Sequence, residues 1–170
     1  MKKSSDILSK ALLISLILIV VDLIGGFAHL RFDTWFKWLS TVVFIAVLIV
    51  FCINYGKTHD EVTFGKVFGY GFKISALSVV FMLLYTLLSL YVIFPEFKDE
   101  LLVKTRSDME AKGGLTEEQI DAAIGMTRKF FVPFAFIGTI IFTLVVGCIG
   151  SLLGAAFAKK SEPNVFQNKP

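Results

Sequence analysis

Three polar residues interrupt an otherwise apolar stretch near the start of the chain. The stretch LISLILIVVDLIGGFAHL, at 13–30, carries Ser15, Asp22 and His29 at intervals of seven residues. Residues seven apart differ by only about 20° around an α-helix, so the three share one face if the stretch is helical. A carboxyl group and an imidazole on that face can hydrogen-bond to another helix or exchange a proton.

Asp22 has two interpretations in an apolar surrounding. Desolvation favours the protonated form of a buried carboxyl group, which can donate as well as accept a hydrogen bond. Asp22 either hydrogen-bonds to a neighbouring helix and fixes its register, or takes up and releases protons together with His29. Lys73 is expected more than two helical turns away in depth, too far for an ion pair. Four hydroxyl-bearing residues are expected at the depth of Asp22: Thr41, Ser78, Tyr85 and Thr139.

The composition indicates the solvent that surrounds these groups. Apolar residues make up 55% of the 170-residue chain and charged residues 18%, and the mean hydropathy is +0.74. Soluble domains average about 45–50% apolar and about 25% charged residues, so much of this chain is expected to face lipid. Its 18 phenylalanines are more than the core of one small soluble domain can hide.

Four segments are long and apolar enough to cross a membrane as helices. A hydrocarbon core of about 30 Å needs about 20 apolar residues. The last segment opens with Pro133, and proline is common at the first position of a helix. The sequence therefore predicts an all-α fold, a single integral membrane domain over 1–170, with a four-transmembrane-helix bundle and a short polar tail at 159–170. The four helices are expected at about 7–30, 35–54, 67–94 and 133–158.

Four crossings place both termini on one side of the membrane. The basic residues divide nine against eight between the two sides, and those on the terminal side lie in short segments with few acids. The positive-inside rule then predicts both termini in the cytoplasm. Lys2 and Lys3 before an apolar run also suggest a cleaved export signal, but the run exceeds the about 7–15 residues of a signal core.

The segment 95–132 is expected to form an amphipathic helical hairpin outside the membrane. Gly113 and Gly114 favour a reversal, and the sequence from Thr116 to Gln119 fits a capping box that begins a second helix. This hairpin either closes the mouth of the bundle as a solvated connector, or docks a partner or gates a ligand. Its second helix carries an apolar stripe at three- and four-residue spacing: Ile120, Ala123, Ile124, Thr127 and Phe131.

Small residues indicate where the predicted helices pack. Helices in lipid associate through close packing and interhelical hydrogen bonds. Gly25 and Gly26 lie beside Asp22 on the first helix. Small and polar residues at heptad-like spacing on the third helix either pack against a neighbour or line a polar cavity: Gly71, Ser75, Ser78, Met82, Tyr85 and Ser89. The most continuous stripe follows the fourth helix: Thr139, Thr143, Gly147, Gly150, Gly154 and Ala158.

The sequence lacks the signatures of soluble enzymes and metal sites. Cys52 and Cys148 are isolated within predicted helices and are interpreted as core residues. His29 and His59 are expected on opposite sides of the membrane, where they cannot share a metal. G-x-S-x-G, H-E-x-x-H and Walker patterns do not occur. We therefore expect no enzymatic activity, no cofactor, no metal and, because basic residues are dispersed among acids, no nucleic-acid partner.

Four stretches, in this order, resemble a known family. They are FGKVFGYGF, YVIFPEF, GGLTEEQIDAAIGMTRKF and SLLGAAFAKK. Nearly the whole chain, and most clearly 64–160, is similar to an uncharacterised family of four-helix integral membrane proteins, a domain of unknown function common in Bacteroidetes. The resemblance implies a multi-pass inner-membrane protein and carries no activity, cofactor or functional residue with it.

Two classes of function follow from this sequence. The first is a non-enzymatic bundle that assembles with itself or with a membrane protein partner through its small-residue stripes and presents the hairpin outside. The second is a small proton-coupled transporter or channel subunit that uses Asp22, by loose analogy with small four-helix multidrug exporters. Both classes require the lipid bilayer as a partner.

Overall fold

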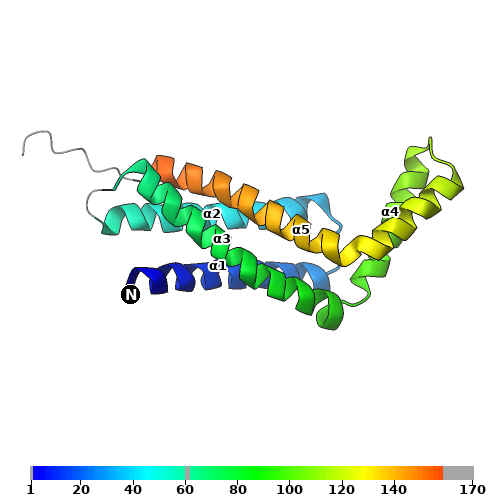
Figure 1. The fold of residues 1–170 in the computed structure, drawn as a ribbon, viewed down its shortest axis with the longest axis horizontal. Coiled ribbons are helices and arrows are strands. Elements are labelled where there is room, and N and C mark those ends of the chain that lie inside the picture. Colours follow the sequence, from blue (N-terminus) through cyan, green and yellow to red (C-terminus); the bar gives the residue numbers. More distant parts are fainter. Residues whose placement is uncertain (1, 60–61, 159–170) are drawn as a thin grey trace, which may run out of the picture. The chain divides into compact units, whose positions relative to one another are not determined.

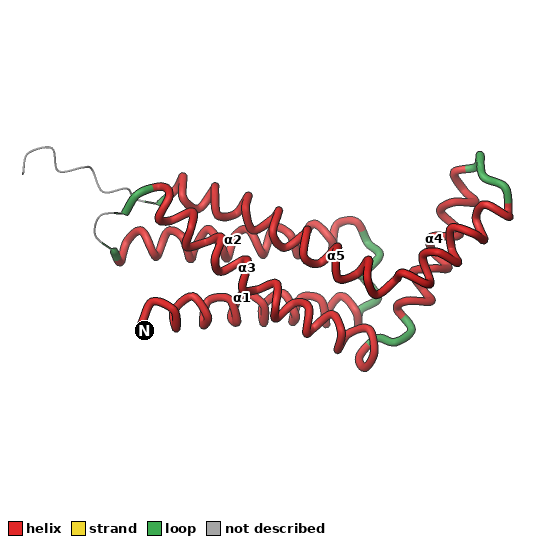
Figure 2. The backbone as a smooth tube through the Cα atoms, viewed as in Figure 1, coloured by secondary structure: helices red, strands yellow, loops and turns green. Residues whose placement is uncertain are grey.

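The described part of the chain is entirely helical. The computed structural model describes residues 2–59 and 62–158, so the tail expected at 159–170 lies outside the described residues. Figure 1 and Figure 2 show the helices. In chain order they are α1 (Lys2–Phe27), α2 (Thr34–Thr58), α3 (Phe64–Leu88) with a π-helical turn η1 (Ser89–Ile93), α4 (Phe97–Lys112) and α5 (Glu117–Phe157). This confirms the all-α prediction.

Among residues 2–59 and 62–158, four helical segments are long and apolar enough to cross a membrane. They span Ser5–Phe27, Thr34–Thr58, Phe64–Ile93 and Glu117–Phe157. Their number agrees with the sequence analysis, and their bounds differ from it at two places that matter for function. One is the end of α1, at Phe27 instead of Leu30, and the other is the start of α5.

Helix α5 begins well before the expected position. The prediction of a helix that begins at Pro133 is wrong, because α5 is continuous from Glu117 to Phe157 and holds Pro133 in its interior. The predicted capping box starts it. The Thr116 amide donates to Gln119 Oε1 (3.0 Å), and the Gln119 amide donates to Thr116 Oγ1 (3.3 Å). Proline removes one backbone hydrogen bond, a loss that helices tolerate when neighbouring groups satisfy the freed carbonyl.

The helices form two compact units, and the first contains a four-helix core. This unit comprises α1, α2, residues 64–82 of α3 and residues 141–157 of α5. Each helix contributes fully or nearly fully buried apolar side chains, among them Ile14, Phe44, Leu48, Ile74 and Ala155. The Ser78 hydroxyl adds a hydrogen bond between helices, donating to the carbonyl of Ala11 (3.3 Å) and to that of Ile74 within its own helix (2.9 Å).

Glycines let the backbones of this unit approach closely. A Cβ atom added to Gly147 of α5 would overlap Ser75 of α3. A Cβ atom on Gly150 would lie 3.0 Å from Leu48 Cδ2 of α2, and one on Gly71 would lie 2.7 Å from Cys52 Sγ. Most of the small-residue stripe on α5 therefore contacts other helices of the same chain, and those contacts leave it no free surface for assembly with a second copy.

The second unit, residues 83–140, contains a helical pair. Gly113 and Gly114 reverse the chain after α4 with φ angles of 66° and 85°, which favour glycine. Ion pairs then join α4 to the first turns of α5, Arg106 to Asp121 (2.7 Å) and Arg128 to Asp99 (3.2 Å). Hydrogen bonds to Glu110 and Asp121 raise the pKa of the Arg106 guanidinium. The apolar contribution is small and centres on Leu102, Ile120 and Phe131.

The close contact at Gly147 predicts a specific loss of stability. We expect Gly147→Ala to lower the free energy of unfolding by about 1–3 kcal/mol, the usual cost of overpacking a filled core. Gly138→Ala is the matched control in the same helix, because a Cβ atom there meets nothing within 4 Å. That control should gain about 0.5–1 kcal/mol from helix propensity. Unfolding in mixed micelles, followed by circular dichroism, measures both.

A second substitution tests the contact itself. Ser75→Gly should restore most of the stability that Gly147→Ala removes, because it removes the atoms that the new Cβ overlaps. Equal effects of the alanines at 147 and 138, or no recovery in the double variant, would contradict the close approach of α5 and α3.

Candidate functional site

The end of α1 is a tight turn that redirects the chain. The Leu30 amide donates to the Gly25 carbonyl (2.8 Å), and the His29 amide donates to the Gly26 carbonyl (3.2 Å). These two bonds, together with a left-handed residue just after the helix, are the Schellman pattern of helix termination. His29 is that left-handed residue, with φ of 55°, in the place that glycine usually takes.

This turn brings Arg31 back to Asp22. The guanidinium Nη2 of Arg31 donates to the carboxylate Oδ2 of Asp22, and the two side chains form an ion pair. The Arg31 side chain is 12% exposed and that of Asp22 is 38% exposed, so the pair is only partly withdrawn from its surroundings. Arg31 keeps its positive charge in any protein environment. The pair therefore joins opposite charges from α1 and from the turn that follows it.

Asp22 lies closer to the end of its helix than the sequence analysis placed it. Because α1 ends at Phe27, Asp22 is five residues, about 7–8 Å, from the last helical residue. The helix expected to continue to Leu30 put it about 12 Å from the end. A carboxylate near the end of a membrane-crossing helix is less costly than one at the centre, since charged side chains near helix ends reach the interface.

The expected polar face of Ser15, Asp22 and His29 is not formed. Ser15 is buried, and its hydroxyl donates to the Ala11 carbonyl within α1 (2.8 Å). His29 follows the end of the helix and is exposed. In the part of the chain that the structure describes, no hydrogen bond or ion pair reaches its side chain. The seven-residue spacing failed at His29 because the helix stops two residues before it.

The other predicted polar residues are dispersed. Ser78 bonds to backbone carbonyls of α1 and α3, and Lys73 is exposed on α3. Tyr85 and Thr139 belong to the second unit, where Tyr85 is buried. Thr139 donates to the Ala135 carbonyl (2.8 Å), and its hydroxyl lies 3.5 Å from that of Thr86.

The glycines predicted to mediate helix packing make different contacts. A Cβ atom on Gly25 would overlap the ring of Phe36, so this glycine lets α1 and α2 approach where the ion pair forms. Gly26 accepts one of the two hydrogen bonds that end α1. Further along α5, a Cβ atom on Gly154 would lie 2.9 Å from Cys52 Sγ and 3.3 Å from the Ile49 Cα atom of α2.

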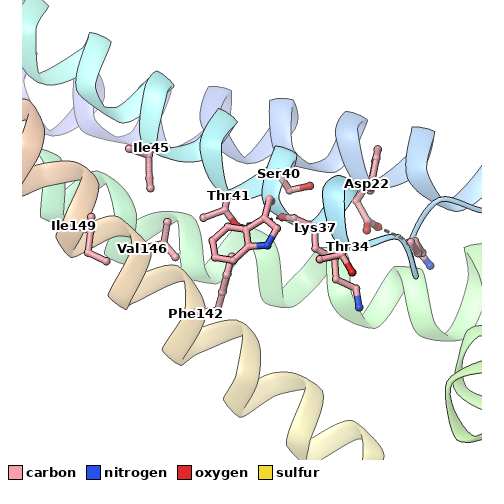
Figure 3. Close-up of a pocket in the computed structure, with 12 residues that line it drawn as sticks. Asp22, Thr34, Lys37, Ser40, Thr41, Ile45, Phe142, Val146 and Ile149 are labelled. Carbon is pink, nitrogen blue, oxygen red and sulfur yellow. Dashed lines mark hydrogen bonds and ion pairs between the residues drawn. The ribbon is translucent and has the colours of Figure 1, made fainter. Parts of the chain in front are cut away.

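A groove of about 750 Å³ opens beside the ion pair, within the first unit. Figure 3 shows charged and hydroxyl side chains at one end of the groove and apolar side chains at the other. Trp38 of α2 and the α5 residue Phe142 are among the side chains that line it and are exposed. The lining is Asp22, Arg31, Thr34, Phe36, Lys37, Trp38, Ser40, Thr41, Ile45, Phe142, Val146 and Ile149.

Among residues 2–59 and 62–158, no group of three or more His, Cys, Asp and Glu side chains could hold a metal ion. Cys52 is buried and Cys148 is partly buried, both as free thiols.

Arg31 and Lys37 were not predicted as site residues. Arg31 was assigned to a loop, nine residues from Asp22, and a helix that continued to Leu30 would have carried it away. The pair depends on a left-handed residue at position 29, and positive φ is uncommon for any residue other than glycine, although histidine adopts it more often than most. The available signal was Gly25-Gly26 followed by an arginine, a pattern compatible with an early helix end.

These observations define a class of protein. It is a small all-α chain with four helices long and apolar enough to cross a membrane, and with an ion pair at the junction of the first two. The chain belongs to a family described as "Protein of unknown function (DUF4199)", whose model matches residues 10–160. The resemblance to a domain of unknown function is thus confirmed. No curated protein and no solved structure matches the chain.

The ion pair predicts coupled stabilities at positions 22 and 31. Arg31→Gln should lower the free energy of unfolding by about 1–3 kcal/mol, because it leaves a partly desolvated carboxylate without its cation. Adding Asp22→Asn should recover part of that loss, since the neutral amide needs no counter-charge. Lys37→Gln, one turn into α2, is the control and should change stability by less than about 0.5 kcal/mol. Strictly additive losses in the double variant would contradict the pairing.

The turn that ends α1 predicts a stabilising substitution. His29→Gly should raise the free energy of unfolding by about 1 kcal/mol, because glycine adopts the left-handed conformation without the Cβ penalty. His29→Ala retains a Cβ atom and should stay near the unmodified protein. Thermal unfolding in one detergent compares the three proteins. Equal stabilities of the glycine and alanine variants would mean that the left-handed turn is not strained.

Proposed function

We propose that this chain is a non-enzymatic, multi-pass component of the bacterial inner membrane that presents α4 and the first turns of α5 to a partner in the aqueous phase. The observation that carries the proposal is the contrast between its surfaces. Eight of the 16 residues of α4 are charged. By contrast, α1 exposes a row of large apolar side chains at every fourth position: Leu8, Leu12, Leu16, Val20 and Ile24.

Exposed apolar surface of that extent needs a solvent other than water. Lipid can surround the membrane-crossing helices, whereas the charges and exposed ion pairs of the α4–α5 pair need water. This supports a hairpin outside the bilayer. With both termini in the cytoplasm, four crossings would place the segment 95–132 on the opposite side of the membrane.

The partner surface is expected on the hairpin and not on the glycine stripe. Gly71, Gly147 and Gly150 already contact other helices of the same chain. On the α4–α5 pair, in contrast, several large apolar side chains remain exposed, including Val103, Leu115, Met126 and Phe130. Apolar side chains among charged ones are common at sites where proteins associate.

A proton-coupled transporter that uses Asp22 is the competing proposal. It would require the carboxylate to release its guanidinium partner in each cycle. The ion pair with Arg31 instead supports a structural role for Asp22. Proteoliposomes under an imposed pH gradient distinguish the two, because flux that Asp22→Asn abolishes would support transport and overturn the structural role.

The placement of the hairpin is tested by thiol labelling. In a variant without Cys52 and Cys148, Ser107→Cys on α4 should react with a membrane-impermeant maleimide in cells whose outer barrier has been opened. Lys57→Cys, at the far end of α2, should react only after the inner membrane is permeabilised. Both positions are exposed, so reactivity reports their side of the membrane. The reverse pattern would overturn the orientation, and no reaction at Ser107→Cys in either state would overturn the extramembrane hairpin.

Partner docking is tested by photo-crosslinking in native membranes. A photoreactive amino acid at Met126, which is 62% exposed, should form a discrete adduct with a second copy or with another protein. The same group at Ile120, which is 4% exposed, is the buried control. Adducts with lipid alone at position 126 would overturn the proposal.

A further inference from the structure

We propose that the groove beside Asp22 and Arg31 binds one anionic phospholipid. Its phosphate would lie near Lys37 at the polar end, and one acyl chain would follow Ile45, Phe142 and Val146 at the apolar end. This inference rests on the membrane placement proposed above and not on the docking role of the hairpin.

The charge of the groove favours an anion. Its lining holds two cations, Arg31 and Lys37, and one acid, Asp22. Arg31 and Asp22 neutralise each other as an ion pair, which leaves the charge of Lys37. Within the described residues no salt bridge reaches Lys37, and Asp33, one turn earlier, is not part of the lining. A phosphodiester carries one negative charge, which complements the positive charge of Lys37.

Hydroxyl groups lie at the same end. Thr34, Ser40 and Thr41 line the groove, and the Thr41 hydroxyl already donates to the Lys37 carbonyl within α2 (3.2 Å). Thr34 also begins α2, and the preceding Asp33 makes no side-chain hydrogen bond to the first amides of that helix. The first amides of α2 therefore have no side-chain acceptor from Asp33 and are available to a ligand at this end.

The apolar end has the direction and length of an acyl chain. Thr34 and Ile45 are 11 residues apart on α2, about 16 Å along its axis. The groove therefore begins where α2 begins and continues toward the middle of the membrane-crossing segment. Phe142 and Ile149 are half exposed, so the groove opens sideways where the bilayer would lie. Trp38, one turn after Thr34 on α2, also lines the groove, and tryptophan is enriched at membrane interfaces.

The volume of the groove is that of a small-molecule site. The groove provides about 750 Å³, which is within the about 300–1,000 Å³ of small-ligand sites. A headgroup with one chain fits this space, and the rest of the lipid stays in the bilayer.

Native mass spectrometry tests the proposal. Phosphatidylglycerol titrated into the detergent-solubilised full chain should give one bound lipid in preference to phosphatidylcholine. Lys37→Gln should weaken that binding about fivefold, the usual contribution of one lysine near anionic lipid. Lys73→Gln, an exposed lysine on α3 outside the lining, should stay within about twofold of the unmodified protein. Equal binding of the two lipids, no loss in Lys37→Gln, or dimers in place of bound lipid would overturn it.

Photo-crosslinking then locates the lipid independently of affinity. Phosphatidylglycerol with a photoreactive acyl chain should modify peptides that contain residues 41–45 and 142–149. Labelling confined to the exposed faces of α1 would overturn the site. If these experiments fail while the thiol labelling succeeds, the membrane placement stands and the lipid site alone is lost.

Discussion

The close approach of α5 to α2 and α3 is the constraint on which the first unit depends. Lipid offers no hydrophobic reward for burying one apolar helix against another, so contact has to come from packing that lipid tails cannot match. Gly147 and Gly150 supply it, since each brings its backbone to a side chain of a neighbouring helix. The groove follows from this packing. It lies at the larger residues Phe142 and Val146, which come before the close contact at Gly147 along α5.

The Asp22–Arg31 pair has a different role at the end of the unit. A carboxylate on an apolar helix is a cost unless a cation accompanies it. Here the cation comes from the turn that ends α1, so the charge is balanced within a short piece of chain. The Phe36 ring beside Gly25 packs α2 against the same turn. The turn that ends α1, the ion pair and the first residues of α2 therefore stabilise one another within a short stretch of the chain.

The sequence predicted the fold through signals that repeat along the chain. Long apolar runs identify the membrane-crossing helices, and the hydroxyl and amide groups of Thr116 and Gln119 identify the start of α5. The site depends on single residues for which no such repetition exists. A left-handed histidine ended α1 earlier than its apolar pattern indicated, which removed His29 from the helix and brought in Arg31. At Pro133 the expected helix start came too late in the chain. Proline often begins a helix, but here it lies inside α5, which begins at Glu117.

The relation between the ion pair and the groove also bears on the choice between a structural and a proton-carrying Asp22. A proton carrier has to alternate between charge states, and each protonation of Asp22 would release the charge of Arg31 into the lining beside Lys37. Two uncompensated cations would then face an opening that is otherwise apolar along half its length. Such a state is costly unless an anion enters with the proton. The geometry is therefore better suited to a structural Asp22, which holds Arg31 in place and leaves Lys37 as the cation available to a ligand.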